Sequence, residues 1–311
     1  MGVRLYCGVS ETSWNGISPR PGKYACVAPV YGRERKVRPS VYIPPGSRVI
    51  LDSGAFSDAS HERLSFEAAL SRQIDHAVTQ RYWDKVELVA TYDLLIDEMW
   101  DGNEREKRRW GEAEAWEAVE TTINAAAFLN SNRHCLQGKG VVMSAQGVTP
   151  DQYLECAAAI VPFVSDVDTF GMGGWCISGL MPKKMLPAFS ATISRLIPML
   201  GQEGIRRVHI WGVIDSEFLG QLLWMCDAHG ILLSTDSSGP HMRPARNGQW
   251  GYKGWINANY QRVEPRLRGR DRAVHVALTR CWLEHGLRQS AFYRPPSDRR
   301  LSRREYRGER E

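Results

Sequence analysis

The sequence predicts an α/β protein whose parallel strands close into a (β/α)8 barrel, and three observations support that fold class. Short apolar segments alternate with helical segments along most of the 311 residues, which is typical of a parallel sheet with crossover helices. Several of the strand segments are apolar throughout, as strands are when both of their faces are buried. Polar residues and glycines follow these strands at their C-terminal ends, where barrel enzymes place their active sites.

The strands and helices can be located from these patterns in chain order. The expected strands are 4–9, 48–52, 86–93, 139–147, 166–174, 206–213 and 230–236. That makes seven, and an eighth strand, if present, is expected in the less regular C-terminal region. The expected helices are 66–80, 113–129, 150–164, 186–200 and 217–230. Pro150 and Asp151 suit a first helical turn, and Gly230 suits the residue that follows a helix.

The domain organisation is expected to be simple, because no repeat or low-complexity linker divides the chain. Residues 1–293 are predicted to form one barrel domain, and residues 294–311 a basic, flexible tail. From residue 243 onward there are 17 Lys and Arg against 7 Asp and Glu, whereas the first 242 residues hold 23 against 28. A basic C-terminal quarter favours a nucleic acid as partner. For 294–311 alone, a solvated tail is the simpler interpretation, and the segment 243–255, with aromatics among its cations, is the better candidate surface.

Other features of the composition exclude several classes of protein. No apolar run approaches the roughly 18 residues of a membrane helix, and no signal peptide is recognisable, so a cytoplasmic protein without a membrane partner is expected. The seven cysteines are scattered, with no CxxC pair, which fits reduced thiols and predicts neither disulfides nor a bound metal. Cys281 and His285 would share a helix face but lack further ligands.

Four polar residues at the ends of predicted strands are the first candidates for chemistry: Asp52, Asp93, Gln146 and Asp236. An isolated aspartate after a strand usually caps a turn, and that interpretation stays open for each one. Since the carboxyl ends of barrel strands meet at one mouth, however, we expect all four side chains to lie close together.

In order along the chain, the strand ends resemble the motifs of the tRNA-guanine transglycosylase superfamily, which exchanges a guanine for a 7-deazaguanine on a (β/α)8 barrel. LDSGAFS resembles that family's TDSGGFQ, SAQG its VQGG, FGMGGWCISG its GGLAVG and HIWGV its MGVG. LSTDSSGPHMRPARNG is similar to MFDCVLPTRNARNG, and WINANY to NAKY. The segments lie at 51–57, 144–147, 170–179, 209–213, 233–248 and 255–260, with TYD at 91–93 where the family has a base-recognising aspartate.

The resemblance implies a role for each carboxylate. Asp236 would be the nucleophile that forms, and later releases, a covalent glycosyl ester. Asp52 would be the general acid and base, which protonates the departing guanine and deprotonates the incoming base. Asp93 would accept hydrogen bonds from the N1–H and 2-amino group of the purine, and Gln146 would meet its O6. No redox or nucleotide cofactor is implied.

The resemblance also implies the remaining contacts to base and backbone. Base-binding positions would be Asp93, Gln146, Gly173, Gly174, Ser53 and Phe56, with the glycines allowing close approach of the ring. Phe56, Tyr92, Met172 or Trp175 could stack on the base, although each could equally be core. Arg243 and Arg246 would hold phosphates, or else form ion pairs at the barrel rim.

The departures from the family pattern bear on the substrate. Members that act on tRNA carry a CxCxxC cluster and a later His that bind zinc in a tRNA-contacting subdomain, and after Tyr260 this chain has no such cluster. It therefore looks more like the DNA-modifying branch, which inserts bases such as 7-cyano-7-deazaguanine into DNA and needs a flipped or single-stranded nucleotide. The alternatives are an enzyme acting on tRNA, a base-removing hydrolase and a catalytically inactive nucleic-acid-binding relative. A homodimer is left open.

Overall fold

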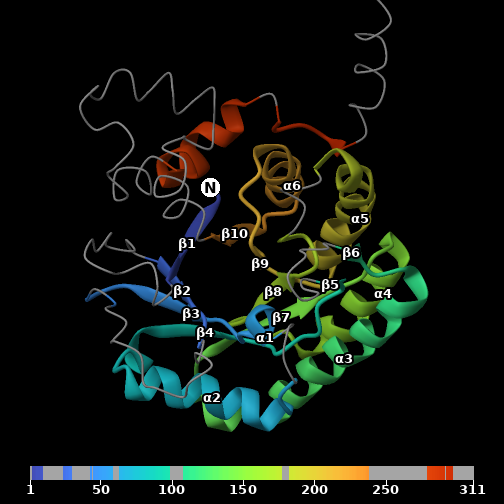
Figure 1. Ribbon diagram of the computed structural model, residues 1–311. Coiled ribbons are helices and arrows are strands. Elements are labelled where there is room, and N and C mark those ends of the chain that lie inside the picture. The colour runs from blue at the N-terminus through green and yellow to red at the C-terminus, as the bar shows by residue number, and fades with distance from the viewer. Residues whose placement is uncertain are drawn as a thin grey trace, which may run out of the picture.

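The structure is a computed structural model of the chain that describes residues 2–9, 24–29, 43, 45–58, 63–98, 108–176, 182–237, 279–290 and 292–296. In this part of the chain, eight parallel strands close into a barrel with helices around its outside, as the sequence predicts (Figure 1). None of the described helices combines the length and hydropathy of a membrane span.

The barrel strands are, in chain order, β1 Arg4–Val9, β2 Tyr24–Val27, β3 Arg48–Leu51, β4 Val86–Ala90, β7 Gly140–Ala145, β8 Thr169–Met172, β9 Arg207–Ile210 and β10 Leu232–Ser237. Around the barrel they follow the order β1-β10-β9-β8-β7-β4-β3-β2, and β2 pairs again with β1. Between β4 and β7, the short strands β5 Asp97–Glu98 and β6 Arg108–Arg109 form a separate antiparallel pair.

The position of the eighth strand differs from the prediction. The barrel closes with β2, at 24–27, and not with a strand from the C-terminal region. This segment contributes only the four residues YACV, a run too short to show a period. Its parallel pairing with β1 and β3 is what makes it a strand.

The helices alternate with the strands and begin where the sequence supplies a cap. The α-helices are α1 Ala55–Asp58, α2 Phe66–Thr79, α3 Glu112–Ser131, α4 Pro150–Ile160, α5 Pro182–Gln202 and α6 Ser216–Ala228. Ser65 Oγ accepts from Ala68 N at the start of α2, and Asp215 Oδ1 accepts from Glu217 N at the start of α6. Such side-chain acceptors satisfy backbone donors that the first helical turn leaves free.

Several boundaries differ from the prediction by a few residues. Helix α4 ends at Ile160, and Val161–Phe163 form a tighter turn, η4, around Pro162. Helix α5 begins at Pro182, four residues earlier than expected, and contains Pro187 and Pro198. The other short helical segments are η2 Trp83–Lys85, η3 Arg133–Leu136, η7 Trp282–Gly286 and η8 Leu287–Gln289.

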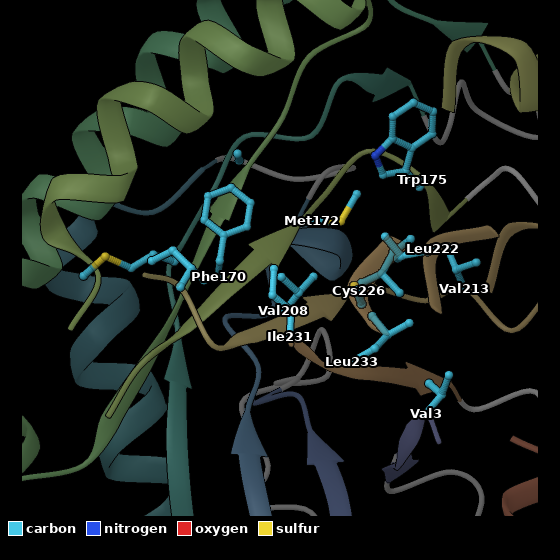
Figure 2. Close-up of a cluster of buried hydrophobic side chains, with 14 of the residues drawn as sticks. Val3, Phe170, Met172, Trp175, Val208, Val213, Leu222, Cys226, Ile231 and Leu233 are labelled. Atoms are coloured by element: carbon cyan, nitrogen blue, oxygen red, sulfur yellow. The ribbon is translucent and has the colours of Figure 1, made fainter. Parts of the chain in front are cut away.

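Side chains of alternate strand residues build two cores. Inside the barrel, Tyr6, Cys26, Ile50, Leu88, Ala90 and Val142 form one buried cluster. Residues in the alternate register face outward and pack under the helices, as Phe170, Met172 and Val208 do in Figure 2 against side chains that include Leu222 and Cys226 of α6. The barrel is thus filled by side chains from within.

A C-terminal segment packs against the barrel where a last helix would be expected. Trp282, Leu283 and Leu287 are buried in the outer core, Leu283 O accepts from Val3 N at 3.0 Å, and Arg288 pairs with Asp227 of α6. Residues 243–278 of the basic region and 297–311 of the predicted tail lie outside the described residues.

A buried ion pair at the N-terminal end of β8 yields a stability prediction. Asp168, with a fully buried side chain, accepts two bonds from Arg133 and others from Ser165 and Val141 N. Asp168→Asn should lower the free energy of unfolding by about 3 kcal/mol, because Arg133 then loses its buried counter-ion. Urea unfolding monitored by circular dichroism measures this loss.

The control is Asp151→Asn, which breaks the Arg195–Asp151 pair, whose side chains are 56% and 76% exposed. An exposed pair contributes less than about 1 kcal/mol. Equal losses for the two variants would contradict the account of Asp168.

Candidate active site

The barrel brings the predicted carboxylates to one rim. Asp52 directly follows β3, Asp93 follows β4 by three residues, Gln146 directly follows β7, and Asp236 is the fifth residue of β10. All four positions are at the C-terminal ends of their strands, as expected from the sequence. The carboxylates also affect one another electrostatically, since the charges of Asp236 and Asp93 both raise the pKa of Asp52.

The two oxygens of Asp236 have different surroundings. Oδ1 accepts from the backbone N–H of Gly212 at 2.8 Å and lies 3.2 Å from Nε2 of His209. No donor among the described residues bonds to Oδ2, and the side chain is 18% exposed. One oxygen is therefore anchored while the other is free to react, which is the arrangement that a carboxylate nucleophile needs.

Asp52 lies in a turn whose backbone is fixed by two hydrogen bonds. Its backbone N–H donates to Val27 O at 2.8 Å, and its carbonyl accepts from the buried amide of Gln73 on α2. Burial is the main cause that raises the pKa of its carboxyl from 3.8 to about 7, and the charge of Asp236 adds to it. Close to neutral pH such a group can both give and take a proton.

Asp93 and Gln146 form a buried pair. Nε2 of Gln146 donates to Oδ2 of Asp93. Burial raises the pKa of Asp93 from 3.8 to about 6, while Arg63 and the bond from Gln146 act in the opposite direction. Oε1 of Gln146 is buried and has no hydrogen-bond partner in the described structure. Because an unpaired buried acceptor is costly, this atom marks a place where a ligand could donate a hydrogen bond.

The loops around Asp93 are fixed by a second network. Arg63 stacks on Tyr92 at 4.4 Å and donates to the carbonyls of Tyr92 and Asp93 at 2.8 and 2.7 Å. The hydroxyl of Tyr92 donates to Asp58 of α1, which also pairs with Arg72. These contacts join the loop after β4 to the loop after β3, so Tyr92 is a buried supporting residue.

The other predicted base contacts have different environments. Ser53 is buried, and its hydroxyl accepts from Ala55 N at 3.3 Å within the turn. Phe56 on α1 is 48% exposed. Met172 and Trp175 are buried in the outer core (Figure 2). Of the four predicted stacking residues, Phe56 is therefore the one with an exposed ring.

The glycines after β8 are explained by close packing. A Cβ at Gly173 would lie 2.8 Å from Cγ of Gln146, and one at Gly174 would lie 2.6 Å from Cδ1 of Ile96. Gly174 also has a φ of +73°, which favours glycine. The two glycines let β8 approach the Asp93–Gln146 pair, and this packing alone accounts for them.

Two residues that sequence reasoning missed line the barrel behind Asp236. His209 on β9 contacts Asp236, and its ring centroid is 4.4 Å from that of Trp211. The indole Nε1 of Trp211 donates to Ser144 Oγ at 2.8 Å. His209 and Trp211 are two residues apart in the segment RRVHIWGV, so their side chains point to the same face of the strand. This two-residue spacing was the sequence signal that could have placed both inside the barrel.

Some predicted features cannot be placed. Arg243 and Arg246 lie outside the described residues. Within the described ranges, no cluster of three or more His, Cys, Asp or Glu side chains is arranged to hold a metal ion.

Comparisons with known proteins leave the activity open. No family model and no curated protein matches the chain. An L-ribulose 3-epimerase is 12% identical, with 93% of this chain and 95% of that chain covered and a TM-score of 0.41. A broad-specificity endoglucanase from Clostridum cellulovorans is 11% identical, with 74% and 77% covered and a TM-score of 0.37. Similarity at this level carries no argument about activity or substrate.

The electrostatic coupling at the mouth can be measured directly. Asp236→Asn should lower the pKa of Asp52 below about 7, because the neutral amide removes a charge that raises it. NMR titration of the aspartate carboxyl carbons measures this pKa, and the signal missing from Asp52→Asn assigns it. Asp227→Asn, which removes a carboxylate paired with Arg288 outside the barrel, should leave the pKa unchanged. An unchanged pKa in Asp236→Asn would mean that the two groups do not interact.

Proposed function

We propose that this chain is a base-exchange transglycosylase that replaces guanine in DNA with a 7-deazaguanine, through a covalent glycosyl ester on Asp236. The observation that carries the proposal is the presence at one barrel mouth of Asp236, whose Oδ2 accepts no bond from the described residues, and Asp52, whose pKa is raised to about 7. A nucleophile and a proton donor are the two groups that base exchange at a glycosidic carbon requires.

In the first half of the reaction, Oδ2 of Asp236 attacks C1′ of the nucleotide. The C1′–N9 bond breaks, and its electron pair leaves with guanine, which takes a proton from the carboxyl group of Asp52. The products are a glycosyl ester on Asp236, a carboxylate on Asp52 and free guanine. The raised pKa of Asp52 supports this step, because much of the group is protonated near neutral pH.

The second half reverses these events with another base. The incoming 7-deazaguanine loses its N9 proton to Asp52, N9 attacks C1′, and the C1′–Oδ2 ester bond breaks. Asp236 and Asp52 return to their starting states, so the exchange needs no net oxidant, reductant or cofactor.

Recognition of the base is supported by the Asp93–Gln146 pair. Gln146 donates to the carboxylate of Asp93, and beside it presents Oε1, which has no partner among the described residues. Two neighbouring acceptors suit the N1–H and 2-amino donors that guanine and 7-deazaguanines share. The amide nitrogen of Gln146 has a second N–H for O6. The exposed ring of Phe56 supplies a surface on which the base can stack.

The choice of DNA rests on the sequence. After Tyr260 the chain lacks the cysteine cluster of the family members that act on tRNA, while its C-terminal quarter is basic. Lys and Arg near the phosphates serve either polymer, so DNA and tRNA are compared directly in the experiment. A base within a duplex stack cannot reach the carboxylates, and flipping or a single-stranded region is required.

The test is base incorporation. Purified protein is incubated with 7-cyano-7-deazaguanine and either duplex DNA, single-stranded DNA or tRNA, and the polymer is digested to nucleosides for mass spectrometry. We expect a 7-deazaguanine deoxynucleoside that is absent with Asp236→Ala. Asp52→Asn should slow incorporation by about 10²- to 10⁴-fold, the usual contribution of a general acid and base.

The control variant is Asp227→Asn, which should incorporate the base at the wild-type rate. A ribonucleoside product would assign tRNA as the substrate instead of DNA. Release of guanine without incorporation would indicate a hydrolase. Binding of DNA without either product, unchanged by Asp236→Ala, would indicate an inactive binding protein.

A further inference from the structure

His209 lies inside the barrel, between its N-terminal and C-terminal ends, and is fully buried. From β9 its ring contacts Trp211, and the ring of Tyr6 meets it edge-on from β1, with centroids 5.8 Å apart. Nε2 lies 3.2 Å from Oδ1 of Asp236, and Nδ1 lies 3.0 Å from the hydroxyl of Ser234. Both ring nitrogens therefore have polar partners on β10.

The hydrogen bonds that His209 makes with Ser234 and Asp236 depend on which ring nitrogen carries a proton. Ser234 Oγ lies 3.2 Å from the carbonyl oxygen of Val208 and can donate to it. The hydroxyl can also donate to Nδ1 of His209, or accept from it, so Ser234 suits either state of that nitrogen. A carboxylate oxygen can only accept, so the contact with Oδ1 of Asp236 is a hydrogen bond when Nε2 carries a proton. The bond to Asp236 is therefore the one that fixes the role of Nε2.

At the other side, Ser234 lines a cavity of about 200 Å³ at the N-terminal end of the barrel. The charged or titratable groups that line this cavity are Arg4, Tyr6, Tyr24, Glu87, Arg207 and Glu284. They are of both signs: Arg4 stacks on Tyr24, and Arg207 donates to the carbonyls of Asp166 and Val167. Among the described residues, Asp236 is the one whose carboxylate contacts the ring of His209.

We propose that His209 is a positioning residue whose Nε2, together with the N–H of Gly212, holds Oδ1 of Asp236 so that Oδ2 is the attacking atom. The role of Oδ2 rests on the proposed function, but the hydrogen bond from His209 does not. A histidine that only fills the barrel interior would need no proton on the nitrogen that faces Asp236.

The first test detects the protons on the ring nitrogens of His209 by NMR. The protein is labelled with ¹⁵N-histidine, and long-range ¹H–¹⁵N NMR correlations are recorded at pH 7. His209→Gln assigns the signals by removing one of the eight histidines. We expect a proton on Nε2 of His209, the nitrogen that faces Asp236, and the same result in Asp227→Asn. An Nε2 without a proton in the wild type would overturn the proposal whether or not the protein exchanges bases.

The second test uses the kinetics of exchange. His209→Gln keeps a neutral donor, and His209→Leu keeps none. kcat should fall by about 10- to 100-fold in the leucine variant, as expected for loss of a hydrogen bond to a charged group, and less in the glutamine variant. KM for the 7-deazaguanine should stay unchanged, since Asp93 and Gln146 bind the base. Equal kcat for wild type and both variants would overturn the positioning role, while an inactive wild type with a proton on Nε2 of His209 would count against the proposed function alone.

Discussion

Closure of the barrel through β1 is the constraint on which the candidate site depends. Strand β1 pairs on one side with β10, where Tyr6 lies opposite Asp236, and on the other with β2, which leads to β3 and Asp52. In an open sheet, β10 and β3 would lie towards opposite edges, and the two carboxylates could not meet. Because all eight strands run parallel, closure also gives them one common C-terminal rim. The chain thus brings together at one mouth residues almost 200 positions apart in sequence.

The same closure brings three carboxylates close together, and their environments distinguish them. Three carboxylates share a partly buried mouth. Burial raises the pKa values of Asp52 and Asp93, and the charges of Asp236 and Asp93 raise that of Asp52 further. Each carboxylate then differs from the others through its own partners. Asp236 has the Gly212 N–H and His209, Asp93 has Gln146, and Asp52 has a weak 3.4 Å contact from Gly54 N. Separate environments for chemically identical groups are how such sites divide the roles of nucleophile, acid and binding group.

Much of this arrangement could be predicted from the sequence, because strand alternation and strand-end polar residues are local signals. The four residues at the mouth follow from those signals once a barrel is assumed. The strand at 24–27 could not be predicted, since four apolar residues become a strand only by pairing with β1 and β3. His209 was missed for a similar reason: a single histidine in an apolar strand resembles core, and its contact with Asp236 depends on the β9–β10 register. Gln73 likewise reaches the carbonyls of β3 and β4 from a helix face that the sequence marks only as amphipathic.

The central claim is that Asp236 becomes covalently attached to the sugar, and one measurement addresses it most directly. The protein is mixed with a guanine-containing DNA oligomer, quenched in acid and digested with a protease, and the peptides are examined by mass spectrometry. The account predicts a glycosyl adduct on the peptide that contains Asp236, which disappears when excess 7-cyano-7-deazaguanine is added before quenching. An adduct on Asp52, or base exchange in the same sample without any adduct, would contradict it.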